Sequence, residues 1–259
     1  LQNVKERSFL KVNLNISRNK NKLAKLSDAM NVYNESQNAS VSGTAPAQLY
    51  YDGVSMNAIW AVRSLGIDPH NGREIYLSSR GLPTYNWSAA DQVVLGDEMP
   101  KFQGTGGISF EWKGIGGNAS FTFQYGAQMY NTTLVQKVEN ANLSDNVDAR
   151  LFDGVWRPGE GGVKPYRAPR YRDPSTGNWV TPETKPTSRF VQDRNEFALT
   201  NLSLYYDFYR YEFLKRCGME RLRVSAYANN LFTISSIEIE RGTSYPFARS
   251  FNFSLSVTF

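Results

Sequence analysis

The feature that most constrains the fold is a strict alternation of apolar and polar residues at the end of the chain. From Ser250 to Phe259, every odd position carries a large apolar side chain and every even position a small polar one. Successive side chains of a β-strand point to opposite faces of its sheet. This segment is therefore predicted to form a strand with one apolar and one polar face.

The same period of two recurs elsewhere in the chain. It is longest where Phe121, Phe123 and Tyr125 alternate with Thr122 and Gln124. Several of the segments approach the roughly 9–11 residues with which a tilted strand crosses a bilayer. Counting a less regular seventh segment, we predict an all-β, antiparallel fold of about seven strands at 10–16, 59–65, 108–112, 119–129, 200–208, 222–228 and 250–259.

Two architectures produce this alternation: a soluble sandwich, in which the apolar face is the core, and a membrane barrel, in which it meets lipid. Two features favour the barrel. The polar faces are small and uncharged, which suits a hydrated lumen, and aromatic residues such as Trp112, Tyr125 and Tyr206 lie near strand ends, where interfacial girdles occur.

The lengths of the connections also favour a barrel, because outer-membrane barrels alternate short periplasmic turns with long outer loops. If the chain ends on the periplasmic side, residues 114–117 and 209–220 are short turns. Residues 66–102, 131–195 and 234–249 are then outer loops. Residues 18–54 break this rule, because they are long and fall on the periplasmic side.

Composition excludes several functions. With one cysteine (Cys217) and one histidine (His70), the chain has neither an internal disulfide nor a cysteine-built or multi-histidine metal centre. The net charge of +5 is thinly spread, which gives little support to nucleic-acid binding. No apolar run of about 18 residues is available for a transmembrane helix. We expect no cofactor, no metal and no catalysis, and from its start at Leu1 we expect a processed chain or a fragment.

Several segments, in this order and spacing, resemble the SusC/RagA-type TonB-dependent outer-membrane transporters of the Bacteroidetes. The similarity runs from about Ser8 to Phe259. The segments are GIDPHNGRE (66–74), VLGDEMPKF (94–102), TLVQKVEN (133–140), WRPG (156–159), TSRFVQD (187–193), LRVSAYANNLFTI (222–234), ERGTSYPFAR (240–249) and the terminal strand.

The resemblance implies that residues 1–259 are the C-terminal part of a larger, 22-stranded barrel, whose plug and N-terminal strands lie outside this chain. It implies a location in the outer membrane of a Gram-negative bacterium and active import of an oligosaccharide or a peptide. The implied partners are the rest of the barrel and its plug, outer-membrane lipid, TonB acting through the plug, and a SusD-like surface lipoprotein. Residues 234–240 are shorter than the corresponding family segment, which leaves the substrate open.

The sequence also suggests roles for individual residues. Phe259, a terminal apolar-facing aromatic, resembles the signal that the barrel-assembly machinery recognises. Flat rings and cations in the outer loops suit contact with substrate or partner, although packing within the loops explains them as well. These candidates are Trp87, Trp156, Tyr166, Tyr171, Arg241 and Arg249, and the predicted lumen-facing residues are Ser120, Thr122, Gln124, Asn252 and Ser254.

Two alternatives remain open on the sequence alone. A stand-alone small barrel would need an eighth strand within residues 18–54, paired with the terminal strand. A soluble β-sandwich that binds carbohydrate would need no membrane, because its apolar rows would pack against each other.

Overall fold

The computed structural model describes residues 2–3, 8–40, 43–144, 147–173, 176–208, 211–238 and 249–259. They form two compact units, each made of segments distant in sequence. The first unit comprises Leu1–Asn19, Pro100–Gly126 and Arg194–Phe259. The second comprises Lys20–Met99 and Ala127–Asp193.

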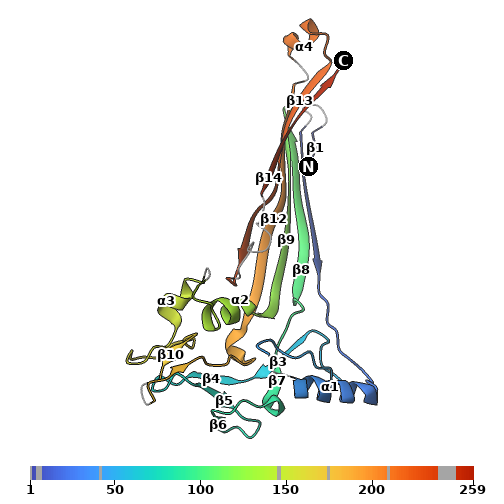
Figure 1. Cartoon of the computed structure of the whole chain (residues 1–259). Coiled ribbons are helices and arrows are strands. Elements are labelled where there is room, and N and C mark those ends of the chain that lie inside the picture. The colour runs from blue at the N-terminus through green and yellow to red at the C-terminus, as the bar shows by residue number, and fades with distance from the viewer. Residues whose placement is uncertain are drawn as a thin grey trace. The chain divides into compact units, whose positions relative to one another are not determined.

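A seven-stranded sheet, of which all strands but β1 are long, makes up most of the first unit (Figure 1). The pairs β1–β2, β2–β8, β8–β9, β12–β13 and β13–β14 are antiparallel, as the sequence predicts. In spatial order the strands are β1 (Gln2–Asn3), β2 (Ser8–Ser17), β8 (Phe102–Trp112), β9 (Ile115–Tyr130), β12 (Val191–Phe208), β13 (Arg221–Ser235) and β14 (Ser250–Thr258).

One predicted strand is wrong. Residues 59–65 do not belong to this sheet but fall into β3 (Ala58–Val62) and β4 (Ser64–Ile67) of the second unit. Ala58, Ile59, Ala61 and Val62 are all buried, so β3 has no polar face of its own. The segment therefore lacks the alternation that identifies the other strands, and the seventh strand of the sheet is β1 instead.

This correction removes the anomaly in the connections. Without a strand at 59–65, residues 18–101 form a single connection between β2 and β8. Residues 131–190 likewise join β9 to β12, whereas residues 113–114 join β8 to β9. Because successive connections of an antiparallel sheet alternate between its two ends, residues 18–101 no longer share an end with the short connection 113–114.

The turn between β8 and β9 is tighter than predicted. Trp112 pairs with Ile115, which leaves Lys113 and Gly114 as a two-residue loop. Their φ angles of 49° and 91° are both positive. A type I′ turn requires positive φ at both central residues, and its twist matches that of the two strands it joins.

A break in the sequence period coincides with an irregularity in strand pairing. The apolar side chains of β12 stand at odd positions up to Leu199 and at even positions from Leu202 onward. The register between β12 and β13 shifts between Leu199 and Asn201, close to Asn230, whose φ is 53°. Such a β-bulge keeps apolar side chains on one face despite the change of phase.

The second unit is built from the long connections and contains three small sheets and several short helices. The two-stranded sheets are β3–β7 (Gln92–Asp97) and β10 (Tyr171–Arg172)–β11 (Trp179–Val180), and the three-stranded sheet is β4–β5 (Glu74–Leu77)–β6 (Pro83–Thr84). The helices are α1 (Asp28–Ser40), α2 (Thr132–Leu134), α3 (Arg150–Gly154), the π-helix η2 (Val135–Glu139) and the 3₁₀ helices η1 (Ala89–Asp91) and η3 (Ser188–Phe190).

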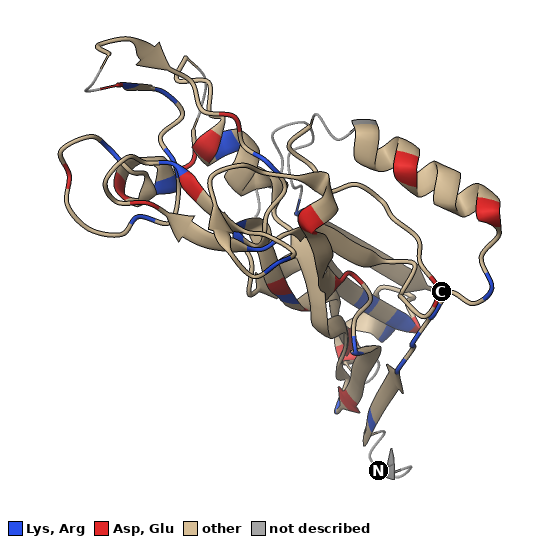
Figure 2. Ribbon diagram, turned by 90° about the horizontal axis from the view of Figure 1, so that it is seen from below, with Lys and Arg blue, Asp and Glu red and all other residues tan. Residues whose placement is uncertain are grey.

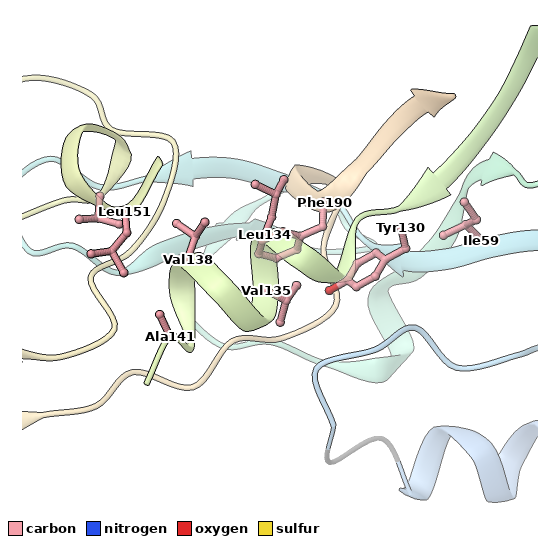
Figure 3. Packing of buried hydrophobic residues seen from close by; sticks show 9 residues of the cluster. Ile59, Tyr130, Leu134, Val135, Val138, Ala141, Leu151 and Phe190 are labelled. Carbon is pink, nitrogen blue, oxygen red and sulfur yellow. The ribbon is translucent and has the colours of Figure 1, made fainter. Parts of the chain in front are cut away.

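This unit has its own hydrophobic core, which Figure 3 shows from close by. Phe190 lies at its centre, fully buried, with its ring edge-on to Tyr130 at 5.5 Å between centroids. The other members are Ile59, Leu134, Val135, Val138, Ala141, Leu151 and Val155. What the sequence suggests are loops is therefore a folded body held by burial of apolar side chains.

Candidate functional site

The polar residues of the sheet form one continuous face. Partners that are directly opposite in neighbouring antiparallel strands point to the same side. Thr122 lies opposite Thr105, which lies opposite Asn15, and Gln124 lies opposite Gln103. In β13 and β14, Ser225 lies opposite Ser254 and Tyr227 opposite Asn252. The predicted lumen-facing residues Ser120, Thr122 and Gln124 thus share a face, and so do Asn252 and Ser254.

An open hollow of about 560 Å³ is lined mainly by this face and also by Ile16, Gly104, Phe123 and Ala198, and we call it the polar groove. Four strands of the first unit, β2, β8, β9 and β12, contribute its walls. Its polar side chains are Asn15, Ser17, Gln103, Thr105, Thr122, Gln124, Arg194 and Glu196. Hydroxyls, amides and one ion pair can donate and accept hydrogen bonds along a polar ligand.

The charged part of the polar groove is fixed by hydrogen bonds. The Gln124 side-chain amide donates to Glu196 Oε2 at 2.7 Å, and Arg194 Nη2 donates to the same oxygen at 3.1 Å. The backbone N–H of Gly126 donates to Asn195 Oδ1 at 2.8 Å. The Glu196 carboxylate is therefore held in one position between β9 and its own strand, while Arg194 remains 37% exposed.

The opposite face of the sheet is apolar, and no residue that the structure describes covers it. Leu14, Leu255 and Phe253 are 57%, 66% and 82% exposed, although each lies in the middle of a strand. Phe121, Phe197 and Phe232 form a row across β9, β12 and β13, with neighbouring centroids at 5.3 and 6.4 Å. Apolar exposure on this scale marks a surface that contacts lipid or another protein.

Two glycines allow this face to pack closely. Gly106 lies opposite Phe121, and a Cβ at Gly106 would come within 2.1 Å of the Phe121 ring. A Cβ at Gly104 would meet the ring of Phe123 and the backbone oxygen of Asn15. The phenylalanine rings therefore cover the glycine positions of β8, an arrangement known as aromatic rescue.

A buried ion-pair network, which the sequence does not reveal, organises the second unit. Arg189 contacts Glu74 and Glu139, and both carboxylates are fully buried. Arg167 adds a backbone hydrogen bond to Glu139 Oε1 at 3.0 Å and a side-chain hydrogen bond to Thr184 at 2.7 Å. The network joins four segments distant in sequence, and a buried charge is tolerated only when it is paired in this way.

The charges in this network shift one another's pKa. Burial by itself raises the pKa of Glu139, but Arg189 and Arg167 outweigh it, so the pKa lies below its usual range. Burial lowers the pKa of Arg189, but its hydrogen bonds to Glu74 and the charge of Glu139 raise it overall. Beside the network, burial raises the pKa of Tyr76 to about 12.

The network collects three of the segments on which the sequence resemblance rests. Glu74 ends GIDPHNGRE, Glu139 lies in TLVQKVEN and Arg189 lies in TSRFVQD. A fourth segment, WRPG, joins them because the indole N–H of Trp156 donates to the backbone oxygen of Pro69 at 2.9 Å. Ion pairs and hydrogen bonds thus hold these four segments together in the second unit.

The aromatic contact candidates lie in this unit, and packing accounts for several of them. Trp156 is only 3% exposed, packs edge-on against Tyr171 at 5.1 Å and closes over Gly72. Tyr166 packs against the core. Trp87 donates its indole N–H to the oxygen of Pro186 at 3.2 Å, and Lys185 lies over its ring. Trp87 and Tyr171 remain half-exposed.

Two other candidates flank the terminal strand β14 in sequence, Arg249 before it and Phe259 after it. Arg249 and Phe259 are exposed. Arg241 lies outside the described residues.

The single histidine, His70, lies in a turn, where its backbone N–H donates to Asp68 Oδ1 at 2.8 Å. Tyr85 donates to the other oxygen of that carboxylate at 2.5 Å.

Charge and metal-binding groups are dispersed. Acidic and basic residues are interspersed along the ribbon in Figure 2 rather than gathered in one patch. Within the described ranges, no group of three or more His, Cys, Asp or Glu side chains is placed to hold a metal ion. None of the helices described is both long and apolar enough to cross a membrane.

Comparison with known proteins adds a relative and several structural neighbours. No protein-family model matches the chain. A TonB-dependent receptor named P3 from Formosa agariphila is 27% identical over 237 residues, which cover 85% of this chain and 22% of the relative.

The solved structures of RagAB are similar in fold. The RagAB peptide importer in its open-open state matches all of this chain and 27% of its own with a TM-score of 0.70 and 17% identity. A second structure of the RagAB peptide transporter matches 92% of this chain and 25% of its own with a TM-score of 0.64 and 18% identity. The chain thus spans about a quarter of the length of these relatives. Sequence and fold together confirm that the chain resembles SusC/RagA-type TonB-dependent transporters.

Proposed function

We propose that residues 1–259 are the C-terminal part of the barrel of a TonB-dependent outer-membrane transporter that imports nutrient oligomers. In this proposal other segments supply the plug and the remaining strands, and TonB acts through the plug. The chain itself supplies barrel wall, polar lumen surface and outer loops. The similarity to a TonB-dependent receptor in sequence and to RagAB in fold supports this assignment.

The observation that carries the proposal is the two-faced sheet. Its apolar rows, including Leu14, Phe253 and Leu255, are exposed, and its polar face holds the polar groove. A soluble sandwich would cover the apolar rows, but no described residue does so. The bilayer core offers no water to unpaired backbone groups, so a sheet that spans it must close. The outer strands β1 and β14 therefore pair with strands beyond those described here.

The stand-alone small barrel finds no such support. It requires a strand within residues 18–54 that pairs with β14. In the described parts of that range, 18–40 and 43–54, the regular element is helix α1, and β13 is the described strand that pairs with β14.

The polar face suits a path for a hydrophilic oligomer. In the proposal, Ser120, Thr122, Gln124, Asn252 and Ser254 face the lumen, and the polar groove borders the route of the substrate. Amides and hydroxyls can pair with the backbone of a peptide or the hydroxyls of a glycan. The name of the RagAB peptide importer favours testing peptides first.

In this proposal, a SusD-like surface lipoprotein binds over the long connections. Exposed apolar side chains in the second unit support a protein contact there, notably Phe152, Val163 and Trp179 at 60%, 79% and 62% exposure. Exposed aromatic residues are enriched at protein interfaces. Trp87, Tyr171, Arg241 and Arg249 remain proposed contacts to substrate or partner, and Phe259 the proposed assembly signal.

Cell fractionation and uptake test the proposal. A strain that lacks the receptor gene should lose growth on particular oligopeptides or oligosaccharides, and a plasmid copy should restore it. Uptake should stop when a protonophore collapses the proton gradient. Recovery of the receptor in the soluble fraction without detergent would contradict the proposal.

A substitution in the polar groove tests its role. Thr122→Trp places a large ring in the path and should slow uptake, whereas Thr122→Ser keeps the hydroxyl and should not. Surface labelling checks that both variants reach the outer membrane in equal amounts. Equal uptake by the two variants would remove the polar groove from the substrate path.

A further inference from the structure

Four aromatic rings form a cluster at the end of the sheet that has the short connections. Tyr206 and Phe208 end strand β12, and Tyr211 and Phe213 come from the connection that follows. The Tyr206 and Phe208 rings meet edge-on at 4.4 Å between centroids. Phe208 lies 5.5 Å from Tyr211 and 6.1 Å from Phe213. The hydroxyls of Tyr206 and Tyr211 are joined by a hydrogen bond.

This aromatic cluster continues the apolar face of the sheet. Tyr206 lies opposite Val224, and Phe208 lies opposite Leu222, both on the apolar side. Tyr211 and Phe213 extend that side beyond the last paired residue and are 46% and 42% exposed. Whatever contacts the apolar face therefore also meets these rings.

The connection that carries the rings is preorganised. Helix α4 (Glu212–Arg216) ends in a Schellman motif, in which Met219 N–H donates to the Leu214 oxygen at 2.9 Å and Gly218 N–H to the Lys215 oxygen at 3.2 Å. Gly218 has a φ of 70°, the left-handed conformation that this motif needs. Leu214 is buried, which fixes α4 against its surroundings and leaves Phe213 outside.

Two cations stand next to the exposed rings. Lys215 and Arg216 occupy the last turn of α4, and both are exposed. Among the described residues neither forms a salt bridge, although Glu212 lies in the same helix. Aromatic rings beside Lys and Arg are the composition of segments that lie at a membrane surface, with rings at the headgroup level and cations near phosphate.

We propose that α4 and the aromatic cluster dock onto the phospholipid headgroups of the leaflet at this end of the barrel. Tyr211 and Phe213 enter the interface, and Lys215 and Arg216 contact lipid phosphate. Continuity with the apolar face and complementary charge identify lipid as the occupant. The inference rests on the proposed function, since it requires that the apolar face lies in a bilayer.

Cys217, the only cysteine of the chain, directly follows α4 and is exposed, so it can carry a probe. The receptor that contains this chain, with any other cysteine replaced by serine, is labelled with bimane and reconstituted in phosphatidylethanolamine vesicles with or without phosphatidylglycerol. Nitroxide lipids carry the quencher either near the headgroup or deep in the acyl chain. We expect strong quenching of bimane at Cys217 by the shallow nitroxide and weak quenching by the deep one.

Variants of the docking residues refine this test. Tyr211→Ser combined with Phe213→Ser should abolish the shallow quenching, whereas Tyr227→Ser, on the polar face, should leave it unchanged. Lys215→Gln combined with Arg216→Gln should remove the difference between vesicles with and without phosphatidylglycerol. Unchanged quenching in both double variants would overturn the proposal.

Two reference labels separate failure of this inference from failure of the proposed function. In a Cys217→Ser background, bimane at Phe251→Cys should be quenched by the deep nitroxide, because Phe251 is exposed on the apolar face and lies opposite Ala228, away from the aromatic cluster. Bimane at Ser254→Cys should be quenched by neither. If Phe251→Cys behaves so but Cys217 is quenched by neither lipid, the docking proposal is wrong and the barrel stands. Protection of that unquenched Cys217 from a water-soluble maleimide would identify a protein as the occupant. Absence of quenching at Phe251→Cys would overturn the membrane barrel itself.

Discussion

Arg189 holds both carboxylate oxygens of Glu74, with Nε 2.7 Å from Oε1 and Nη2 2.6 Å from Oε2. The two residues are 115 positions apart in the chain. This bidentate pair is stronger and more specific in direction than a pair involving lysine. It joins the end of the GIDPHNGRE segment to the residues that lead into β12.

Arg189→Gln should strongly destabilise the second unit. The change leaves two buried carboxylates, Glu74 and Glu139, without their main cation, and breaking a buried pair in this way costs about 3–5 kcal/mol. Hydrogen exchange or limited proteolysis of the connections measures the loss. Arg157→Gln is the matched control, because its pair with Glu160 is exposed and surface pairs contribute about 0–1 kcal/mol. Equal protection in both variants would refute the structural role of Arg189.

Acid should weaken the same unit. The pKa of Glu139 is lower in the folded state than in the unfolded state, so its contribution to stability is complete above the unfolded pKa. That contribution is lost as the pH falls through the lowered, folded-state pKa. Proteolysis of the connections across an acid pH series should show this loss, and Glu139→Gln should flatten it. An equally steep pH dependence in Glu139→Gln would assign the effect to other groups.

Lysine substitutions on the two faces of β9 should differ in cost. Phe123→Lys places a charge on the apolar face and should cost about 2–4 kcal/mol near the bilayer midplane. Thr122→Lys, one residue away on the polar face, should cost much less because water reaches it. Urea unfolding of the receptor in vesicles measures both. Similar losses at the two positions would contradict the assignment of lipid and lumen faces.

Gly106→Ala should destabilise the sheet. The added methyl group would come within 2.1 Å of the Phe121 ring, which already packs on Phe197 at 5.3 Å. Overpacking of this kind costs about 1–3 kcal/mol. Gly161→Ala is the control, because no atom lies within 4 Å of the new methyl group. A lower unfolding temperature is expected for Gly106→Ala alone.

The sequence predicts the sheet well because its signal is local. Alternation assigns six of the seven strands and both faces, and it places Thr122 and Gln124 on the polar side. Alternation does not fix where a strand begins and ends, because strand pairing extends β12 and β9 beyond their periodic segments. Alternation fails for strand β3 because its residues are buried on both sides, so apolar content there does not identify a face of the long-stranded sheet.

The second unit could not be predicted in the same way. Its stability depends on pairs such as Arg189 with Glu74, whose members are too far apart in sequence for any periodicity to connect them. Trp156 shows the same limit. Its type suggests a ligand contact or packing, and only the fold reveals that its indole N–H donates to the oxygen of Pro69 and that its ring lies against Gly72.

The outer edge of β14 has a consequence for biogenesis. Every residue of this strand is exposed, and none of the described strands pairs with its outer side. A bare edge beside a row of phenylalanines recruits other chains into aggregates. In the proposed barrel this edge is covered only after closure, so we predict that overproduction sends the unclosed polypeptide into inclusion bodies.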